Sequence, residues 1–512
     1  DRGGDWSSDV CSSDLHRKTG PKGPREGKLP DYYSQKRGKV VGTSVNTPRS
    51  LRLPIVPSEI EHGRVLPASK YADINDLVFE PSPLLSDDII KRCVYGFFKH
   101  KYPIMPVLDS EHIHASLPYM RNDPEQYSLI AALCAFIILQ PEILGPPGLP
   151  EQSDGLLPSS KFFVGEAQRA RRYCDYIETP TLVAVQTSFF LFSTHFPLEN
   201  NNSAWFYLRE AMTMLQLLRY HDEDTYSTIA DPKYATYCRR TFWLLFITER
   251  AYALQRHRPL TLQGSINLPI VDPGPEATIL AGFLDLVSLF QNFDDTFLSV
   301  WNLSTASSNA SSQSLIHLQD ILTYALPNVT DRTEIQQADL LISRQWLKTL
   351  VWQLCLAKGL LSSTPVSESM SFYYPITIAR DVVLISKLLP LNSFEANGIG
   401  ILEKVFDVGC SLADILLVYP NATQNCNLQI GPRDYLMELI RIMGTVLGGS
   451  SRYLRLLAFK ADECLQVRLR RNLCQVEASN NVRVIEDVSN DDGTLNDKID
   501  DAVLYGPSIS LG

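Results

Sequence analysis

The sequence predicts an all-α protein in which residues 84–475 form one large helical domain. Hydrophobic residues make up 45% and charged residues 20% of the 512 residues, a composition that suits a globular chain with a large core. Between residues 84 and 475, apolar positions recur at steps of three and four almost throughout, and strand-like alternation is nearly absent. We find no repeat with a fixed period of about 30 to 50 residues, which argues against a helical solenoid.

Capping residues and apolar periodicity mark the first helices. Ser86 followed by Asp87 and Asp88 is typical of a helix start, because a serine oxygen caps free amide groups and acids favour the first turn. From this start, the pattern predicts helices over residues 87–100, 125–140, 160–177 and 181–195.

Two longer helices follow in the middle of the chain. In the segment AWFYLREAMTMLQLLRY, Trp205 and Leu208 begin a series at helical spacing, so we expect an amphipathic helix that ends near Tyr220. The segment DPKYATYCRRTFWLLFITERAYALQRHRP is apolar nearly all round between Thr241 and Ile247. A helix with this pattern is buried among other helices, and Pro259 should terminate it.

The rest of the domain continues the helical pattern. It predicts helices over residues 276–302, 314–325, 332–360, 376–389, 393–418 and 432–474. The last of these is expected to break at the sequence GGSS, residues 448–451, because glycine disfavours a helix interior.

A basic segment precedes this domain. Residues 16–83 are rich in Pro, Gly, Ser and charge, which predicts a linker, and residues 16–50 hold nine Lys and Arg against two Asp and Glu. Such an arm can follow DNA phosphates, and we expect Lys18, Lys22 and Arg25 to make those contacts. The alternative is an ordinary solvated or nuclear-import linker.

An acidic segment follows the domain. Residues 476–512 hold eight Asp and Glu against two Lys and Arg, with apolar residues spaced among the acids. This composition predicts a tail that stays disordered until a partner protein takes up its apolar residues. The alternative is a solvating tail without a partner.

Ten cysteines are scattered through the chain, most of them inside apolar runs and none in a C-x-x-C pair. We therefore expect buried thiols in a reducing compartment rather than disulfides. The apolar stretches are too short to span a bilayer and the first residues lack the order of a signal peptide. A soluble intracellular protein without a membrane partner is the expectation.

The motifs that place a nucleophile, a phosphate cradle or a zinc ion in common enzymes are missing. We therefore expect no catalytic residue, no bound cofactor and no metal site in this chain. The alternative that remains is a helical, magnesium-dependent enzyme of the terpene-synthase type, in which Asp294 and Asp295 would hold Mg²⁺ for a diphosphate substrate. The usual third acid is absent, because Phe297 and Leu298 follow the pair.

Two segments carry a family resemblance. LREAMTMLQLLRYHDEDTY, residues 208–226, is similar to a helix that ends in a His and acidic residues in the regulatory, or middle homology, region of fungal zinc-cluster transcription factors. RRTFWLLFITERAYALQRHRP, residues 239–259, resembles that family's signature of paired Arg, Phe-Trp, an acid-Arg pair and a terminal Arg-Pro. Within the family, the sequence of this segment is most similar to those of regulators of maltose, starch or sucrose use. The acid of the pair is Glu249 where Asp is commoner, and Leu218-Arg219-Tyr220 replaces the frequent Gly-Leu.

The resemblance implies a nuclear, sequence-specific activator of RNA polymerase II genes for carbohydrate catabolism, of which this chain is the regulatory region. It also implies that DNA is read by a six-cysteine zinc cluster, so that zinc belongs to the full-length protein only, because Cys11 is the one cysteine before Cys93. Residues 1–15 resemble the translation of a sequencing adapter, and we expect them to be an artefact that replaces the true N-terminus.

The resemblance also suggests roles for particular residues and partners. The signature residues are expected to hold the helix to its neighbours, a structural role favoured over ligand contact; they are Arg239, Arg240, Phe242, Trp243, Glu249, Arg250, Arg258 and Pro259. The expected partners are DNA, a coactivator or corepressor, a sugar inducer and a second copy of the chain. Residues 16–83 contain no heptad run that would support the dimer.

Overall fold

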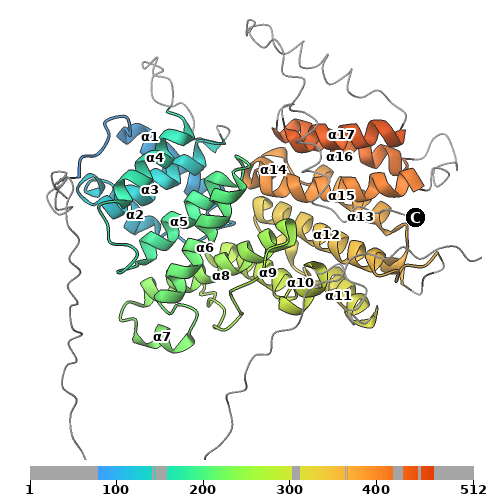
Figure 1. Cartoon of the computed structure of the whole chain (residues 1–512), viewed down its shortest axis with the longest axis horizontal. Helices are drawn as coiled ribbons and strands as arrows, with labels where there is room; N and C mark the ends of the chain where they lie inside the picture. Colours follow the sequence, from blue (N-terminus) through green and yellow to red (C-terminus); the bar gives the residue numbers. More distant parts are fainter. Residues whose placement is uncertain are drawn as a thin grey trace, which may run out of the picture. The chain divides into compact units, whose positions relative to one another are not determined.

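The computed structural model describes residues 79–140, 143–144, 158–302, 312–363, 365, 367–418, 430–447 and 451–465. These residues are mainly helical, and the one β-bridge among them joins Ser362 and Ser371, which confirms the all-α prediction (Figure 1). Residues 1–15, nearly all of the predicted linker and the whole predicted tail lie outside the described residues. The proposed domain limits at residues 84 and 475 stay predictions.

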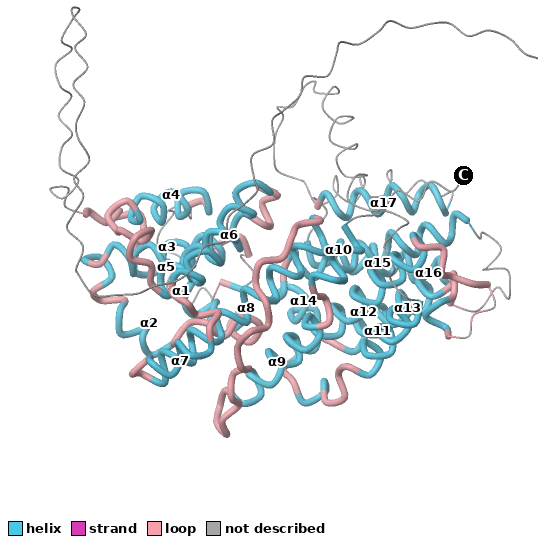
Figure 2. The backbone as a smooth tube through the Cα atoms, turned by 60° about the horizontal axis from the view of Figure 1, so that its bottom comes forward, coloured by secondary structure: helices cyan, strands magenta, loops and turns pink. Residues whose placement is uncertain are grey.

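The first group of helices is built around α3 (Pro124–Ile137) and α5 (Leu182–His195). Helix α3 packs against α1, α4 and α5, and α5 packs against α6 (Figures 1 and 2). The expected cap is present, since the Ser86 side chain accepts a hydrogen bond from the amide of Ile89. The other members are α1 (Asp87–Gly96), the π-helix Phe97–Lys101, α2 (Ser110–Ser116), the 3₁₀ turn Met120–Asn122, α4 (Ser160–Arg171) and α6 (Asn201–Leu217).

The middle group contains the longest helices. Helix α8 (Pro232–Arg256) contacts α5, α6, α9 and α10, and α12 (Glu334–Ala357) contacts α9 and α11. The remaining members are α7 (Glu223–Thr228), α9 (Ala277–Gln291), α10 (Asp295–Asn302), α11 (Ser312–Tyr324) and the 3₁₀ turn Val329–Asp331.

The last group surrounds α15 (Ile399–Val418), which packs against α12, α13, α16 and α17 (Figure 1). The other members are the 3₁₀ turn Glu368–Met370, α13 (Tyr374–Leu388), α14 (Leu391–Asn397), α16 (Pro432–Leu447) and α17 (Arg452–Leu465). Helices α16 and α17 replace one predicted helix: α16 ends at Leu447 and α17 begins at Arg452, on the two sides of the break that the sequence predicted.

Two hydrophobic cores hold these helices together, and α12 contributes to both. The core that runs from Leu85 to Met370, called the N-terminal core below, takes Trp346 and Leu350 from α12. The core that runs from Ala338 to Ala461, called the C-terminal core, takes Ile342 and Trp352 from the same helix. Helix α12 is therefore buried on two sides.

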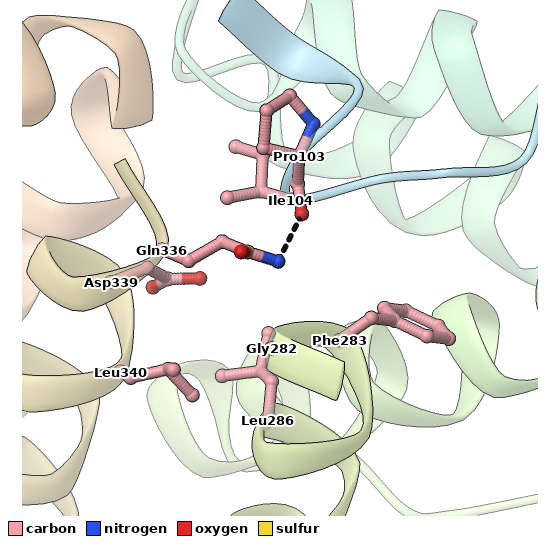
Figure 3. Close-up of a pocket in the computed structure, with 8 residues that line it drawn as sticks. All are labelled: Pro103, Ile104, Gly282, Phe283, Leu286, Gln336, Asp339 and Leu340. Atoms are coloured by element: carbon pink, nitrogen blue, oxygen red, sulfur yellow. Dashed lines mark hydrogen bonds between the residues drawn. The ribbon is translucent and has the colours of Figure 1, made fainter. Parts of the chain in front are cut away.

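A small hollow lies between α9, α12 and the segment after the π-helix, where Gly282 lets Gln336 of α12 approach α9 (Figure 3). The Gln336 amide donates to the carbonyl oxygens of Pro103 at 2.8 Å and Ile279 at 2.7 Å. A side chain at position 282 would collide with this amide. The hollow has space for about one water molecule, so it does not fit a sugar.

Polar contacts also join the first and middle groups of helices to the last group. Lys101, which is 1% exposed, donates to the carbonyl oxygen of Ala396 at 2.6 Å, near the end of α14. Arg256, the last residue of α8, donates to Glu403 of α15 at 3.0 Å and to the Tyr453 hydroxyl of α17 at 3.2 Å. These contacts give partners to two charges that burial would otherwise penalise.

Two helices predicted as continuous are each divided in two. The predicted helix 276–302 breaks after Gln291 because Asp294 starts a second helix, its side chain accepting a hydrogen bond from the amide of Phe297 at 2.9 Å. The predicted helix 393–418 breaks at Gly398, which adopts a φ of 68°. This left-handed conformation favours glycine and ends α14.

Sequence periodicity missed two short helices, α2 and α7. Each begins after an aspartate, Asp109 or Asp222, whose side chain accepts a hydrogen bond from the backbone amide two residues on. Because these helices have seven and six residues, they contain too few turns for an apolar period to show.

The sequence predicted free thiols and no membrane-spanning segment, and the described residues can be compared with both expectations. All seven described cysteines are free thiols, and four of them are buried. Within the described ranges, no helix is long and apolar enough to cross a membrane.

Asp407 of α15 should make stability depend on pH. Its carboxylate accepts the indole N–H of Trp346 at 2.8 Å, and burial raises its pKa from 3.8 to about 7. The folded state therefore holds a proton that the unfolded state releases, and the free energy of unfolding falls as pH rises between these two values. Asp407→Asn keeps an acceptor oxygen without the charge, so it should raise the thermal midpoint more at about pH 8 than at about pH 5.

Asp414→Asn is the matched control for this experiment, because Asp414 lies on the same helix and pairs with Lys460 at 2.6 Å. This change should raise the midpoint at neither pH. An equal shift for Asp407→Asn at both pH values would show that the Asp407 carboxylate does not titrate in this range.

Candidate functional site

Helix α8, which carries the family signature, begins and ends with defined caps. The Asp231 side chain accepts a hydrogen bond from the amide of Lys233, and Pro232 occupies the first turn, where its missing N–H leaves no bond unmade. The helix ends at Arg256, and His257 adopts the left-handed conformation with a φ of 51°. The end thus comes three residues before Pro259, close to where the sequence predicted it.

The aromatic residues of the signature lie deep in the N-terminal core. Phe242 is 0% exposed and Trp243 and Phe246 are each 1% exposed, as the sequence predicted for Trp243 and Phe246. The ring centroids of Trp243 and Phe246 are 4.9 Å apart in an edge-on arrangement. The Trp243 indole N–H donates to the carbonyl oxygen of Asn267 at 3.0 Å. The ring therefore fixes the loop after α8 as well as the core.

Arg239 binds the same loop through a second route. Its guanidinium donates to the two carboxylate oxygens of Glu223 at 2.7 Å each and to the carbonyl oxygen of Asn267 at 2.9 Å. The Asn267 amide donates back to Glu223 at 2.8 Å. Hydrogen bonds from Arg239 hold the pKa of Glu223 down to about 2, so this carboxylate stays charged at neutral pH. Helices α7 and α8 and the loop are thereby tied together.

Arg240 points to the other side of α8. Its guanidinium donates to the carboxylate of Glu276, just before α9, at 2.9 Å and to the Tyr102 hydroxyl at 3.1 Å. The Tyr102 hydroxyl also donates to Glu276 at 2.5 Å. Since Arg240 is 5% exposed, this arrangement neutralises a charge that burial would otherwise penalise.

The acid-Arg pair of the signature, Glu249 and Arg250, binds the backbone of Leu262. Leu262 donates its amide to Glu249 at 2.9 Å, and its carbonyl oxygen accepts from Arg250 at 3.1 Å. Glu249 is 0% exposed and Arg250 is 2% exposed. Burial raises the pKa of Glu249 and lowers the pKa of Arg250 to about 10. The two side chains thus provide hydrogen-bond partners for backbone groups in a loop that has no secondary structure of its own.

Arg258 and Pro259 contribute differently from the other signature residues. The Arg258 guanidinium lies 5.4 Å from the centre of the Trp205 ring on α6, which is within cation–π range. Pro259 is exposed. The contacts of the signature fit the predicted structural role, which stays a prediction until variants test it.

The remaining residues singled out by sequence are placed as follows. Asp294 caps α10 and Asp295 accepts a hydrogen bond from Gln263 at 2.5 Å. In the described part of the chain, no group of three or more His, Cys, Asp or Glu side chains is placed to hold a metal ion. Six of the seven cysteines found there lie in helices, and Cys174 lies in the segment between α4 and α5. Lys18, Lys22 and Arg25 lie outside the described residues.

Sequence reasoning missed the partners of the signature, which are Glu223, Glu276, Tyr102 and the backbone of Leu262 and Asn267. The acidic residues after His221 were part of the resemblance. Their position shortly before the paired arginines of α8 was the one signal in the sequence for Glu223 as a partner. The sequence gives no signal for the remaining partners, because they lie 12 to 138 residues along the chain from the α8 residues that they contact.

Comparison with known proteins finds regulators of sugar use. The chain is 29% identical to a probable sucrose utilization protein, SUC1, of Candida albicans over 337 residues, which are 64% of each chain. It is 23% identical to the maltose fermentation regulatory protein MAL13 of Saccharomyces cerevisiae, over 65% of this chain and 68% of that one. It is 22% identical to the respiratory transcription factor ZNF1 of the same yeast over a similar span. No family model matches the chain.

These relatives agree with the family that the motifs indicated, and they give no support to the magnesium-dependent enzyme. The chain spans a little less than two thirds of the length of the Candida protein.

We expect Trp243→Ala to lower the free energy of unfolding by about 3 to 5 kcal/mol, as truncation of a buried aromatic side chain does. The loss combines a cavity in the N-terminal core with the hydrogen bond to Asn267. Chemical denaturation of wild type and variant measures it. Phe206→Ala on α6 is the control, because Phe206 is 60% exposed and should change stability by less than about 1 kcal/mol. Equal effects of the two changes would place Trp243 outside the stabilising core.

Proposed function

We propose that this chain, a homologue of fungal regulators of sucrose and maltose utilisation, is the regulatory region of a sequence-specific transcription factor for carbohydrate catabolic genes. The observation that carries the proposal is the similarity to such regulators over about 65% of the chain. The all-helical fold and the contacts of the signature helix support it, because the residues that carry the resemblance form one connected structure around α8.

The proposal assigns separate tasks to the parts of the protein. A zinc cluster outside this chain reads DNA in the nucleus, and the basic arm with Lys18, Lys22 and Arg25 adds phosphate contacts. The helical region receives the metabolic signal from a sugar inducer or from a coactivator or corepressor, and a second copy of the chain provides the dimer. Residues 476–512 are proposed as the activation segment, since acids interspersed with apolar residues suit a coactivator surface.

A reporter experiment tests this function in yeast cells. Residues 1–512 are fused to an unrelated DNA-binding domain, and reporter output is compared in glycerol, glucose, sucrose and maltose. We expect higher output in sucrose or maltose than in glycerol, and loss of that output when residues 476–512 are removed. The fusion must be shown to be expressed and nuclear in each medium.

Identical output in all four media from a nuclear, well-expressed fusion would contradict the regulatory function. Carbon-source dependence that survives removal of residues 476–512 would keep the regulatory function and move the activation segment elsewhere.

A further inference from the structure

The outer face of α1 and of the π-helix that follows it carries three cations. Lys91 and Lys99 are exposed and Arg92 is half-buried. On the opposite side of α1, Ile90 and Val94 lie in the N-terminal core. Because the apolar side of an amphipathic helix packs on the core and its polar side faces water, the three cations point away from the protein.

An exposed tyrosine lies among these cations. Tyr95 is 48% exposed, and the ammonium nitrogen of Lys99 lies 5.5 Å from the centre of its ring. Lys91 and Tyr95 are four residues apart on α1, so they too are neighbours on one face. The phenol hydroxyl of Tyr95 adds a hydrogen-bond donor between the two lysines.

The cations of this face outnumber its acids. The ion pairs found among the described residues include none of Lys91, Arg92 and Lys99. Asp87 is bound by Arg121 at 2.8 Å, which leaves Asp88 as the acid exposed beside the three cations. The whole chain, in contrast, has a formal net charge of −10. This face is therefore a place where an otherwise acidic protein attracts anions.

We propose that Lys91, Arg92, Tyr95 and Lys99 form a surface that binds the phosphate backbone of double-stranded DNA. The three cations pair with phosphates and release their counterions, and the Tyr95 hydroxyl donates a hydrogen bond to a phosphate oxygen. Because the surface contacts phosphates alone, it reads no base sequence. It adds affinity and fixes the position of the helical domain on the duplex.

The position of this face along the chain favours DNA over other anionic partners. Helix α1 is the first helix of the described chain, and the basic arm of residues 16–50 precedes it. DNA that is held by the arm, or by the zinc cluster proposed outside this chain, stays near α1 and meets it at a raised effective concentration. The inference thus rests on the proposed function, in which the protein binds DNA.

The salt dependence of DNA binding by the 512-residue chain tests this surface. Binding to a fluorescent duplex of arbitrary sequence is followed by anisotropy between about 50 and 200 mM sodium chloride. Each phosphate contact contributes about 0.9 to the slope of log K against log salt concentration, so Lys91→Ala combined with Lys99→Ala should reduce that slope by about 2. Lys91→Arg combined with Lys99→Arg keeps both charges and should retain the wild-type slope.

A matched control removes two positive charges at another place. Arg433 of α16 and Arg455 of α17 are exposed, and Arg433→Ala combined with Arg455→Ala should leave the slope unchanged. Because all four altered side chains are exposed, each variant should keep the wild-type unfolding midpoint, which thermal unfolding checks.

An unchanged slope in the double lysine variant, or an equal reduction in the control, would overturn the proposal. Displacement of the labelled duplex by polyglutamate as readily as by unlabelled duplex would also overturn it, because the face would then suit an acidic protein. The reporter experiment is a separate measurement. A reporter that ignores the carbon source, beside a reduced slope in the double lysine variant, would reject the proposed regulation and retain the DNA-binding surface.

Discussion

The burial of α12 on two sides is the constraint on which the rest of the structure depends. Trp346 enters the N-terminal core while Trp352, less than two turns further, enters the C-terminal core. A helix in this position has little solvent-facing surface, so its polar residues need partners inside the protein. Gln336 finds two backbone carbonyls, and Asp339 pairs with Lys404.

The signature helix α8 is joined to this arrangement at its end, where Arg256 reaches Glu403 on α15. In the middle of the helix, Arg239 and Trp243 bind the backbone of Asn267 in the loop after α8. Glu403 also belongs to the helix whose Asp407 accepts the Trp346 indole of α12. A short series of contacts therefore links the loop after α8 to the C-terminal core. Such a connection suits a regulatory region that has to pass a signal from one part to another.

Sequence reasoning predicted the fold well and the site only in part. Long periodic segments such as α8 and α12 were predicted because an apolar pattern over six or more turns is hard to mistake. The breaks at Asp294 and Gly398 were missed, because the apolar pattern continues through both and the local cap or left-handed residue decides the outcome. The burial of Trp243 was predicted, but the partner of the acid-Arg pair was not. That partner is the backbone of Leu262, and backbone groups leave no mark in a sequence.

The shared helix makes the two cores one cooperative unit, and unfolding followed by two probes tests this most directly. Trp346→Phe shortens a side chain of the N-terminal core and removes its indole bond to Asp407 of α15, and Trp352→Phe shortens a side chain of the C-terminal core and removes its bond to the carbonyl oxygen of Ser371. Differential scanning calorimetry and far-UV circular dichroism should show one coincident transition for wild type, and both variants should shift that whole transition downward. Two separate transitions, each moved by only one of the variants, would contradict the account.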